Sequence, residues 1–143
     1  MKLRELMSKP VIRIQPDETI AVAARLLEHN NIGAMPVCEP DGRLCGMLTD
    51  RDIVTRCLAA GKSPQNTCVR EIMTGKIYVA RPDMDASLAA GLMGREQISR
   101  LPVMENGKLC GMISLGDLAI KEESSLEAGD ALTEISSHLS SRE

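Results

Sequence analysis

Apolar and polar positions follow one order along this chain and then follow it again. Each copy opens with a short helical turn and an apolar strand, at 11–14 and at 77–80, before a Pro-Asp pair. The apolar residues that come next have the i, i+3, i+4 and i+7 spacing of one helix face. They are Ile20, Ala23, Ala24 and Leu27 in the first copy, and Ala86, Ala89, Ala90 and Met93 in the second. The pattern predicts a helix in each copy, with small residues that allow close packing.

A β-hairpin is predicted after each of these helices. Apolar runs at 34–38 and 44–48 flank a Pro-Asp-Gly turn, and runs at 101–104 and 108–113 flank an Asn-Gly turn. Asn-Gly indicates a tight hairpin because both of its residues accept positive φ angles. A second helix then closes each copy, at 50–58 in the first, so the repeated unit is β-α-β-β-α.

The start of the second helix carries a closely repeated motif. Residues 46–53 read Gly-Met-Leu-Thr-Asp-Arg-Asp-Ile, and 111–118 read Gly-Met-Ile-Ser-Leu-Gly-Asp-Leu. Earlier segments repeat at an offset of 66 residues and this motif at 65, because the second hairpin turn is shorter by one residue. A duplicated fold tolerates such a difference at a turn. The chain is therefore predicted to be an α/β (α+β) protein of two β-α-β-β-α repeats, 1–65 and 66–123, related by pseudo-two-fold symmetry.

Residues 124–143 lie beyond the repeats and are rich in Ser and Glu. Their larger apolar residues are spaced as one helical stripe: Leu126, Leu132, Ile135 and Leu139. Two interpretations stay open, a solvated tail and a helix that packs on the body of the protein or on a partner subunit.

Composition narrows the classes of function. The 143 residues include one Tyr, nine Met and neither Phe nor Trp, so an aliphatic core is expected. The net charge of −3 comes from interspersed acidic and basic residues, which argues against a basic nucleic-acid groove. The longest uncharged apolar stretch, 86–94, is far shorter than the ~20 residues that span a bilayer, and the first residues lack the apolar core of a secretory signal. We expect a cytoplasmic protein that binds neither nucleic acid nor membrane.

Neither the cysteines nor the histidines form a pattern typical of a reactive site. The five cysteines are odd in number, and no C-x-x-C pair or close Cys/His spacing occurs. Buried thiols in a reducing compartment explain them better than a disulfide or a metal site. The sequence also lacks a Ser/His/Asp arrangement and a Gly-rich phosphate loop, so we do not expect an enzyme.

The repeated helix start has two chemical interpretations. Thr49-x-x-Asp52 and Ser114-x-x-Asp117 each match a capping box, in which the hydroxyl and the acid satisfy free backbone N–H groups. A helix N-terminus also attracts phosphate, and an aspartate there can accept hydrogen bonds from both hydroxyls of a ribose. Arg51 adds a cation beside the first copy. Both helix starts are therefore candidate sites for a ligand with ribose and phosphate groups.

This doubled pattern resembles a pair of CBS domains, the cystathionine β-synthase repeats that form a Bateman module. The resemblance rests on apolar-Gly-apolar-apolar-Thr/Ser-x-x-Asp at the end of each hairpin and Ile-x-x-Met/Leu-Pro-Val at its start, and it covers residues 1–123. It implies two clefts between facing repeats, which in many family members bind AMP, ADP, ATP or S-adenosylmethionine. It also implies a homodimer, an unidentified protein partner that the module regulates, and no obligatory cofactor.

The resemblance further implies which residues bind the ligand. The ribose-binding aspartate of the family falls on Asp52 and Asp117, and its accompanying hydroxyl falls on Thr49 and Ser114. The contacts to the base or the phosphates fall on Val11, Ile12, Ala34, Ile77, Tyr78 and Arg100. Because the second copy has Gly116 where the first has Arg51, one tight site and one weak or empty site are expected.

Three functions are consistent with these features. The first is a regulatory module that senses an adenine nucleotide or adenosyl compound in the cleft between its CBS repeats and modulates a partner protein. The second is a structural dimerisation or docking module that binds no nucleotide. The third is a redox or metal sensor that uses the cysteines.

Overall fold

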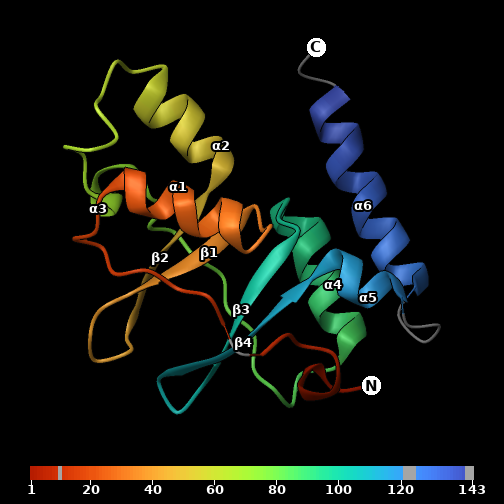
Figure 1. Cartoon of the computed structure of the whole chain (residues 1–143). Helices are drawn as coiled ribbons and strands as arrows, with labels where there is room; N and C mark the ends of the chain where they lie inside the picture. Colours follow the sequence, from red (N-terminus) through yellow and green to blue (C-terminus); the bar gives the residue numbers. More distant parts are fainter. Residues whose placement is uncertain (10, 121–124, 141–143) are drawn as a thin grey trace. The chain divides into compact units, whose positions relative to one another are not determined.

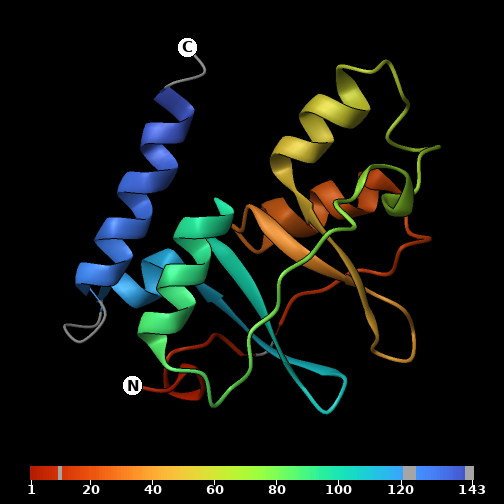
Figure 2. The same cartoon turned by 180° about the vertical axis from the view of Figure 1, so that it is seen from behind.

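The computed structural model describes residues 1–9, 11–120 and 125–140, which form two compact units. The first unit is Val11–Ile77, and the second unit combines Met1–Pro10 with Tyr78–Glu143. Each unit contains a two-stranded antiparallel sheet together with helices (Figure 1, Figure 2). The predicted α/β (α+β) fold class is confirmed.

The first unit has one long helix, a hairpin and shorter helical segments. Thr19 caps the long helix, because its Oγ1 accepts a hydrogen bond from the Val22 N–H at 3.3 Å. The helix predicted over 50–58 is confirmed in two parts, the second of them π-helical. In chain order the elements are α1 (Ile20–His29), β1 (Ala34–Cys38), β2 (Leu44–Thr49), α2 (Asp50–Asp52), η2 (Ile53–Leu58) and α3 (Val69–Ile72).

The second unit repeats the long helix, hairpin and following helix of the first and adds a C-terminal helix, while its short helical segment comes first in the chain. Its hairpin turn has positive φ at Asn106 and Gly107, 54° and 76°, as the Asn-Gly pair predicts. The sheets share one irregularity in register, after Val37 in the first unit and after Val103 in the second. The elements are η1 (Leu3–Glu5), α4 (Ala86–Glu96), β3 (Arg100–Glu105), β4 (Lys108–Ser114), α5 (Leu115–Ile120) and α6 (Ser125–Ser140).

The predictions of strands at 11–14 and 77–80 are wrong in length, because each segment forms only a single β-bridge. In the first unit this segment makes one parallel bridge, in which the Ile14 N–H donates to the Pro36 carbonyl and the Cys38 N–H donates to the Ile14 carbonyl, at 3.2 and 2.9 Å. Continuing the ladder in either direction requires an N–H from Pro16 or from Pro36, and proline has none. Ala80 makes the same single bridge in the second unit, between prolines at the same positions.

The short helical segments belong to the opposite unit from the one their sequence position suggests. The Ser8 N–H donates to the Met112 carbonyl at 2.8 Å, so the N-terminal segment adds to the second unit. Thr74 exchanges two backbone hydrogen bonds of 2.9 Å with Met47, so the segment after α3 adds to the first unit. The bounds of the two compact units therefore differ from those of the two predicted repeats. The ranges 1–65 and 66–123 describe the repeat in the sequence, and they stay a prediction.

A methionine packs on a strand glycine where each exchanged segment meets its hairpin. A Cβ added at Gly111 would lie 2.6 Å from the Sδ of Met7, and one added at Gly46 would lie 2.7 Å from the Sδ of Met73. These distances are shorter than real Cβ contacts, so a larger residue at Gly111 would displace the Met7 side chain, and one at Gly46 would displace Met73 and also meet the Thr74 carbonyl.

The C-terminal segment is a helix over Ser125–Ser140, and it packs on α4 and α5 (Figure 1, Figure 2). Its buried face is Ala128 and Ala131, with Ile135 partly buried beside them. Leu132 is 56% exposed, so the predicted Leu/Ile stripe is wrong there, and the side chains of Leu126 and Leu139 lie outside the described residues. Small residues face the body because the α6 backbone approaches Gly94 closely, at 3.1 Å from an added Cβ to the Ala131 Cα.

Within residues 1–9, 11–120 and 125–140, no helix is long and apolar enough to cross a membrane.

Candidate functional site

The two repeated helix starts fold as capping boxes. In the first unit the Asp52 N–H donates to Thr49 Oγ1 and the Thr49 N–H donates to Asp52 Oδ2, both at 3.0 Å. In the second unit the same two bonds join Ser114 and Asp117, at 3.0 and 2.9 Å. Each aspartate therefore uses Oδ2 for the cap, and its Oδ1 is not part of the capping box.

The two aspartates differ in burial and in their cationic neighbours. Asp52 is 7% exposed, and its Oδ1 lies 3.7 Å from the Arg56 Nε. The Arg56 guanidinium also donates to the Ile72 carbonyl at 3.4 Å, so it lies across the end of α3. Asp117 is half-buried, and the residue that corresponds to Arg56, Lys121, lies outside the described residues. Sequence reasoning missed Arg56, although its i+4 spacing from Asp52 was a usable signal.

Backbone hydrogen bonds hold the residues before each hairpin against the helix start. The Asp50 N–H donates to the Gly33 carbonyl at 2.9 Å, and the Leu115 N–H donates to the Ser99 carbonyl at 2.8 Å. The carbonyl before the first hairpin strand therefore meets the first residue of the second helix in both units. This bond fixes the position of the strand entry relative to the capping box.

Strand pairing brings two further predicted site residues to the helix starts. Ala34 pairs with Thr49 across the first hairpin, and Arg100 pairs with Ser114 across the second. Ala34 is buried, whereas Arg100 is exposed at the start of its strand. The first unit thus groups an apolar residue with its capping box, and the second unit groups a cation with its own.

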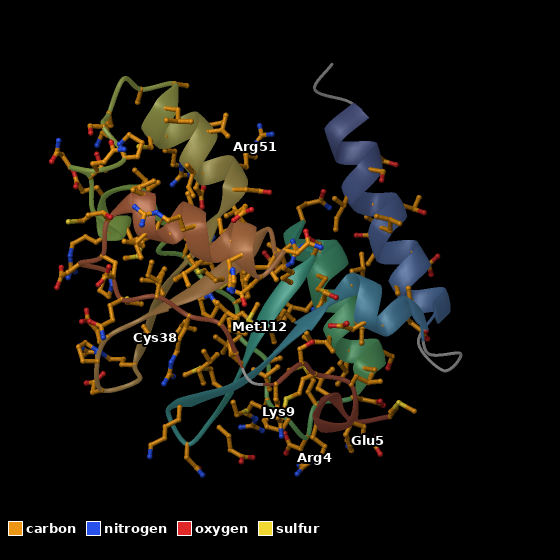
Figure 3. All side chains as sticks on the ribbon, in the orientation of Figure 1. Arg4, Glu5, Lys9, Cys38, Arg51 and Met112 are labelled. Atoms are coloured by element: carbon orange, nitrogen blue, oxygen red, sulfur yellow. The ribbon has the colours of Figure 1, made fainter. Side chains whose placement is uncertain are left out.

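Arg51 is exposed on α2, beside the first capping box (Figure 3). The backbone N–H of Arg51 donates to Asp50 Oδ1 at 2.8 Å, so a second carboxylate lies in the same helical turn. Asp50 was not singled out from the sequence, and its repeat equivalent is the apolar Leu115. The first helix start is therefore the more highly charged of the two.

The residues expected to contact the base lie in the segments that lead into each unit. Val11, Ile12, Ile77 and Tyr78 are all half-buried. Ile12 packs against the core of the first unit and Tyr78 against the core of the second. Packing against a core accounts for Ile12 and Tyr78 without a ligand, and the role of all four residues in base binding stays a prediction.

All five cysteines are free thiols. The Sγ of Cys45 donates to the Val37 carbonyl and that of Cys110 to the Val103 carbonyl, both at 3.3 Å, where each sheet has its register irregularity. Burial raises the pKa of Cys45 and Cys110, and also that of Cys38, so all three favour the protonated thiol. Among the described residues, no three Cys, His, Asp or Glu side chains are grouped to hold a metal ion.

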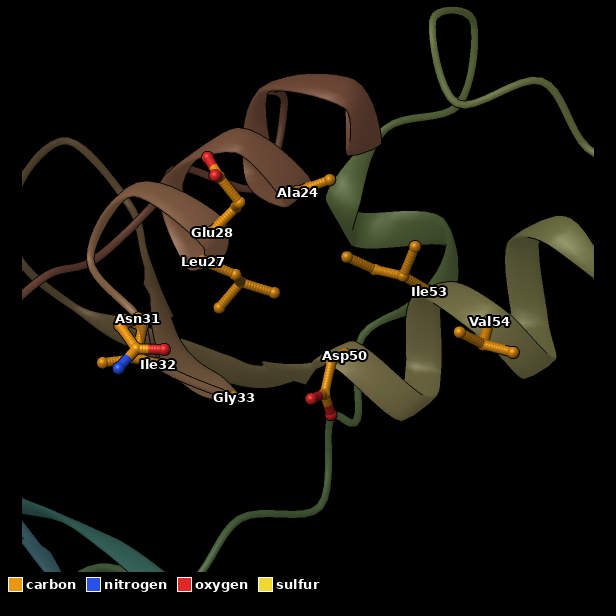
Figure 4. Close-up of a pocket in the computed structure, with 9 residues that line it drawn as sticks. All are labelled: Ala24, Leu27, Glu28, Asn31, Ile32, Gly33, Asp50, Ile53 and Val54. Atoms are coloured by element: carbon orange, nitrogen blue, oxygen red, sulfur yellow. The ribbon is translucent and has the colours of Figure 1, made fainter.

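The first unit also has an open groove of about 650 Å³ between α1 and the α2–η2 helix. Leu27 and Ile53 extend toward each other across it, and Asp50 lies at its rim (Figure 4). No sequence pattern had indicated this groove. Its lining residues are Ala24, Leu27, Glu28, Asn31, Ile32, Gly33, Asp50, Ile53 and Val54.

Comparison with known proteins places this chain in a family. The family model described as CBS domain matches it twice, at residues 3–59 and 69–122. The chain is 42% identical over 134 residues to the CBS domain-containing protein YhcV of Bacillus subtilis, with 94% of each chain covered. It is 35% identical to hypoxic response protein 1 of Mycobacterium tuberculosis, with 81% of each covered.

Solved structures give the same result. Hypoxic response protein I with two coordinated zinc ions has a TM-score of 0.78 and 33% identity, over 84% of this chain and 98% of that one. The CBS domain pair of protein MJ0100, in complex with 5-methylthioadenosine and S-adenosyl-L-methionine, has a TM-score of 0.77 and 28% identity over the same shares. This chain therefore belongs to the CBS domain family and carries two CBS domains in tandem.

Proposed function

We propose that this CBS pair is a regulatory module that binds an adenine nucleotide or adenosyl compound at the helix starts of Asp52 and Asp117. Binding of the ligand would alter how the module acts on a partner protein. The observation that carries the proposal is the duplicated helix start, in which each aspartate caps through Oδ2 and keeps Oδ1 outside the capping box. A carboxylate oxygen at this place can accept a hydrogen bond from a ribose hydroxyl.

A related protein supports the ligand class. The CBS pair of MJ0100 was solved with 5-methylthioadenosine and S-adenosyl-L-methionine. Both compounds contain adenosine, whose ribose carries two neighbouring hydroxyl groups.

The charges around the two helix starts support unequal sites, because the first has Asp50 and Arg51 where the second has Leu115 and Gly116. Arg51 is exposed beside the first capping box, and Arg100 is exposed beside the second. A guanidinium binds phosphate through paired hydrogen bonds, which favours a phosphorylated ligand over an uncharged nucleoside. We expect one tight site and one weak site, with the tight one lost in Arg51→Ala or in Arg100→Ala.

A ligand panel tests the proposal on the full chain. AMP, ADP, ATP, NADH and S-adenosylmethionine are added separately, and thermal unfolding is followed with each. A ligand at 100 times its Kd should stabilise the protein by about 2.7 kcal/mol, which is a measurable rise in Tm. Absence of a shift with every ligand, followed by absence of heat in calorimetry, would contradict the proposal.

The capping boxes themselves favour a second candidate, a docking module that binds no nucleotide. Thr49 and Asp52 satisfy each other's backbone N–H groups, so helix capping explains both side chains without a ligand. This candidate predicts no response to the panel. Adding zinc to the panel tests the third alternative, a metal or redox sensor that uses the cysteines.

A further inference from the structure

The chain passes between its two units twice, and a short segment precedes each crossing. Residues 1–9 belong to the second unit and 69–77 to the first, and the chain changes unit after residue 10 and after residue 77. Toward its end each segment forms a single β-bridge with a hairpin strand, Ser8 with β4 and Thr74 with β2 (Figure 1, Figure 2). Both covalent links between the units therefore start close to a bridge of two backbone hydrogen bonds.

A buried side chain anchors the start of each segment, and a methionine packs at its end. Leu3 and Val69 have no exposed surface, and they belong to the cores of the second and the first unit, respectively. The residue directly before each bridge is Met7 in one segment and Met73 in the other. Both methionines are half-buried and pack against the same two cores. Because two hydrogen bonds contribute little net stability, the packing of these methionines decides whether each bridge stays closed.

Each methionine lies directly on a strand glycine. The Sδ, Cγ and Cβ atoms of Met7 lie 2.6, 2.9 and 3.2 Å from a Cβ added at Gly111. The Sδ and Cγ atoms of Met73 lie 2.7 and 3.1 Å from a Cβ added at Gly46, and the Thr74 carbonyl oxygen lies 2.9 Å from the same point. The thioether therefore fills the space that a side chain would take on the strand, and its sulfur has no room for another atom on that side.

These two sulfurs are accessible to a small oxidant, and their oxidation has a structural consequence. Met35 and Met93 are fully buried and Met1 is 39% exposed, whereas Met7 and Met73 lie between these limits. Oxidation of a methionine to its sulfoxide adds an oxygen and a strong dipole to the sulfur. The new oxygen requires water or a hydrogen-bond donor, because a polar group left against an apolar core without a partner is costly. A sulfoxide at either contact therefore favours the open segment.

We propose that Met7 and Met73 are oxidation sites through which hydrogen peroxide opens the bridges at the two chain crossings. A sulfur lone pair attacks one peroxide oxygen, and the O–O bond breaks. That oxygen stays on the sulfur, and its proton passes to the departing hydroxide, which leaves as water. The sulfur loses the two electrons that the peroxide gains. The sulfoxide then leaves Gly111 or Gly46 and the adjacent bridge opens, and a methionine sulfoxide reductase reverses the change.

Glutamine variants of the full chain test the two contacts without an oxidant, because glutamine has about the length and polarity of methionine sulfoxide. Hydrogen exchange measured by NMR reports the opening at the four N–H groups that form the bridges, those of Ser8, Met112, Thr74 and Met47. In Met7→Gln the two amides of the first bridge should exchange about ten- to a hundredfold faster, and in Met73→Gln the two amides of the second.

The matched control is Met104→Gln, because Met104 is half-buried in β3 and lies outside both segments. This variant should leave the exchange of all four bridge amides unchanged. The amides of Leu3 and Val69, at the anchored starts of the segments, should stay protected in all three variants. Circular dichroism confirms that each variant is folded.

Hydrogen peroxide tests the chemistry on the wild-type chain. Mass spectrometry should show that Met7 and Met73 are oxidised more slowly than Met1 and faster than Met35 and Met93. The bridge amides should lose protection as the two sulfoxides form and regain it on treatment with a methionine sulfoxide reductase. In the double variant Met7→Leu/Met73→Leu neither contact contains sulfur, so peroxide should leave the bridge amides as protected as they were before treatment.

Unchanged exchange in both glutamine variants would overturn the proposal, because the methionines would then not hold the bridges. Resistance of Met7 and Met73 to peroxide, at the level of Met35 and Met93, would overturn it as well, and so would opening of the bridges by peroxide in the leucine double variant. A response at one bridge alone would remove the other methionine from the proposal. None of these measurements uses a nucleotide, so their outcome is independent of the ligand proposal.

Discussion

Replacing Asp52 with asparagine separates helix capping from ligand binding. Asp52 accepts the Thr49 N–H through Oδ2 at 3.0 Å, and the side-chain carbonyl of asparagine can accept the same bond. The ion pair with Arg56, 3.7 Å away and 54% exposed, is lost, but such a pair contributes about 0–1 kcal/mol. We therefore expect the free energy of unfolding to fall by about 1 kcal/mol or less.

Ligand affinity should respond more strongly than stability. A hydrogen bond to a charged acceptor contributes roughly 1.5–3 kcal/mol, so its loss weakens binding about 10- to 150-fold. Isothermal titration calorimetry on Asp52→Asn and Asp117→Asn, with the ligand that the thermal panel selects, measures this change. The two variants should differ, because Arg51 stands beside one aspartate and Gly116 beside the other.

A capping carboxylate without an assigned ligand provides the control. Glu71 occupies the same position in the capping box of α3, where its Oε2 accepts the Cys68 N–H at 2.7 Å. Glu71→Gln should leave ligand affinity unchanged. Unchanged affinity in both aspartate variants would refute the ribose assignment and leave capping as their whole role. An equal loss of ligand affinity in Glu71→Gln would show that ligand affinity depends on the overall stability of the protein and not on the two aspartates.

The remaining predictions concern packing and ionisation. Gly111→Ala should lower the unfolding free energy by about 1–3 kcal/mol, because the added Cβ meets the Met7 Sδ, and urea denaturation should show partial rescue by Met7→Ala. Gly46→Ala should resist such a rescue, because a backbone carbonyl oxygen also lies 2.9 Å from its added Cβ. Gly94→Val should detach α6, and faster amide exchange in that helix measures the detachment. Burial raises the pKa of the Cys38 thiol above its ordinary 9.0, so the unfolded chain ionises first. The stability that the buried, protonated Cys38 contributes is complete below the pKa of the unfolded chain and is lost as pH rises through the pKa of the folded protein. Tm values of the wild-type protein and of Cys38→Ser, measured from pH ~7 to ~10, test this expectation.

The sequence predicted those features of the fold that depend on local pattern. Helices, hairpins and the Asn-Gly turn followed from spacing and turn chemistry, because each is stabilised by neighbours in sequence. The strand over 11–14 was overestimated, because an apolar run does not show that Pro16 and Pro36 remove the N–H groups needed to extend its pairing. Tertiary pairing decides such a strand, and its partner is distant in sequence.

Side-chain placement on helix surfaces was the least predictable feature. The stripe through Leu132 was the face that a packed helix would bury in one of the two open interpretations, yet the close approach to Gly94 favours Ala128 and Ala131 at the contact. Hydrophobicity alone ranks leucine above alanine, whereas the distance between helix backbones decides which of them fits. The capping motifs were predictable because hydroxyl and acid interact within one turn, but the position of Arg56 over Asp52 depends on how η2 winds.

The first helix start differs from the second in what surrounds it, and the difference lies in α2, which has three residues. Asp52 at its end belongs to the capping box, and Asp50 at its start lines the open groove. In the second unit the position of Asp50 is taken by Leu115, which is buried in the core that α6 closes. A ligand at the first helix start would therefore act next to an open groove, whereas one at the second start would act next to a buried core. The two candidate sites are unequal in their surroundings even though their capping boxes have the same hydrogen bonds.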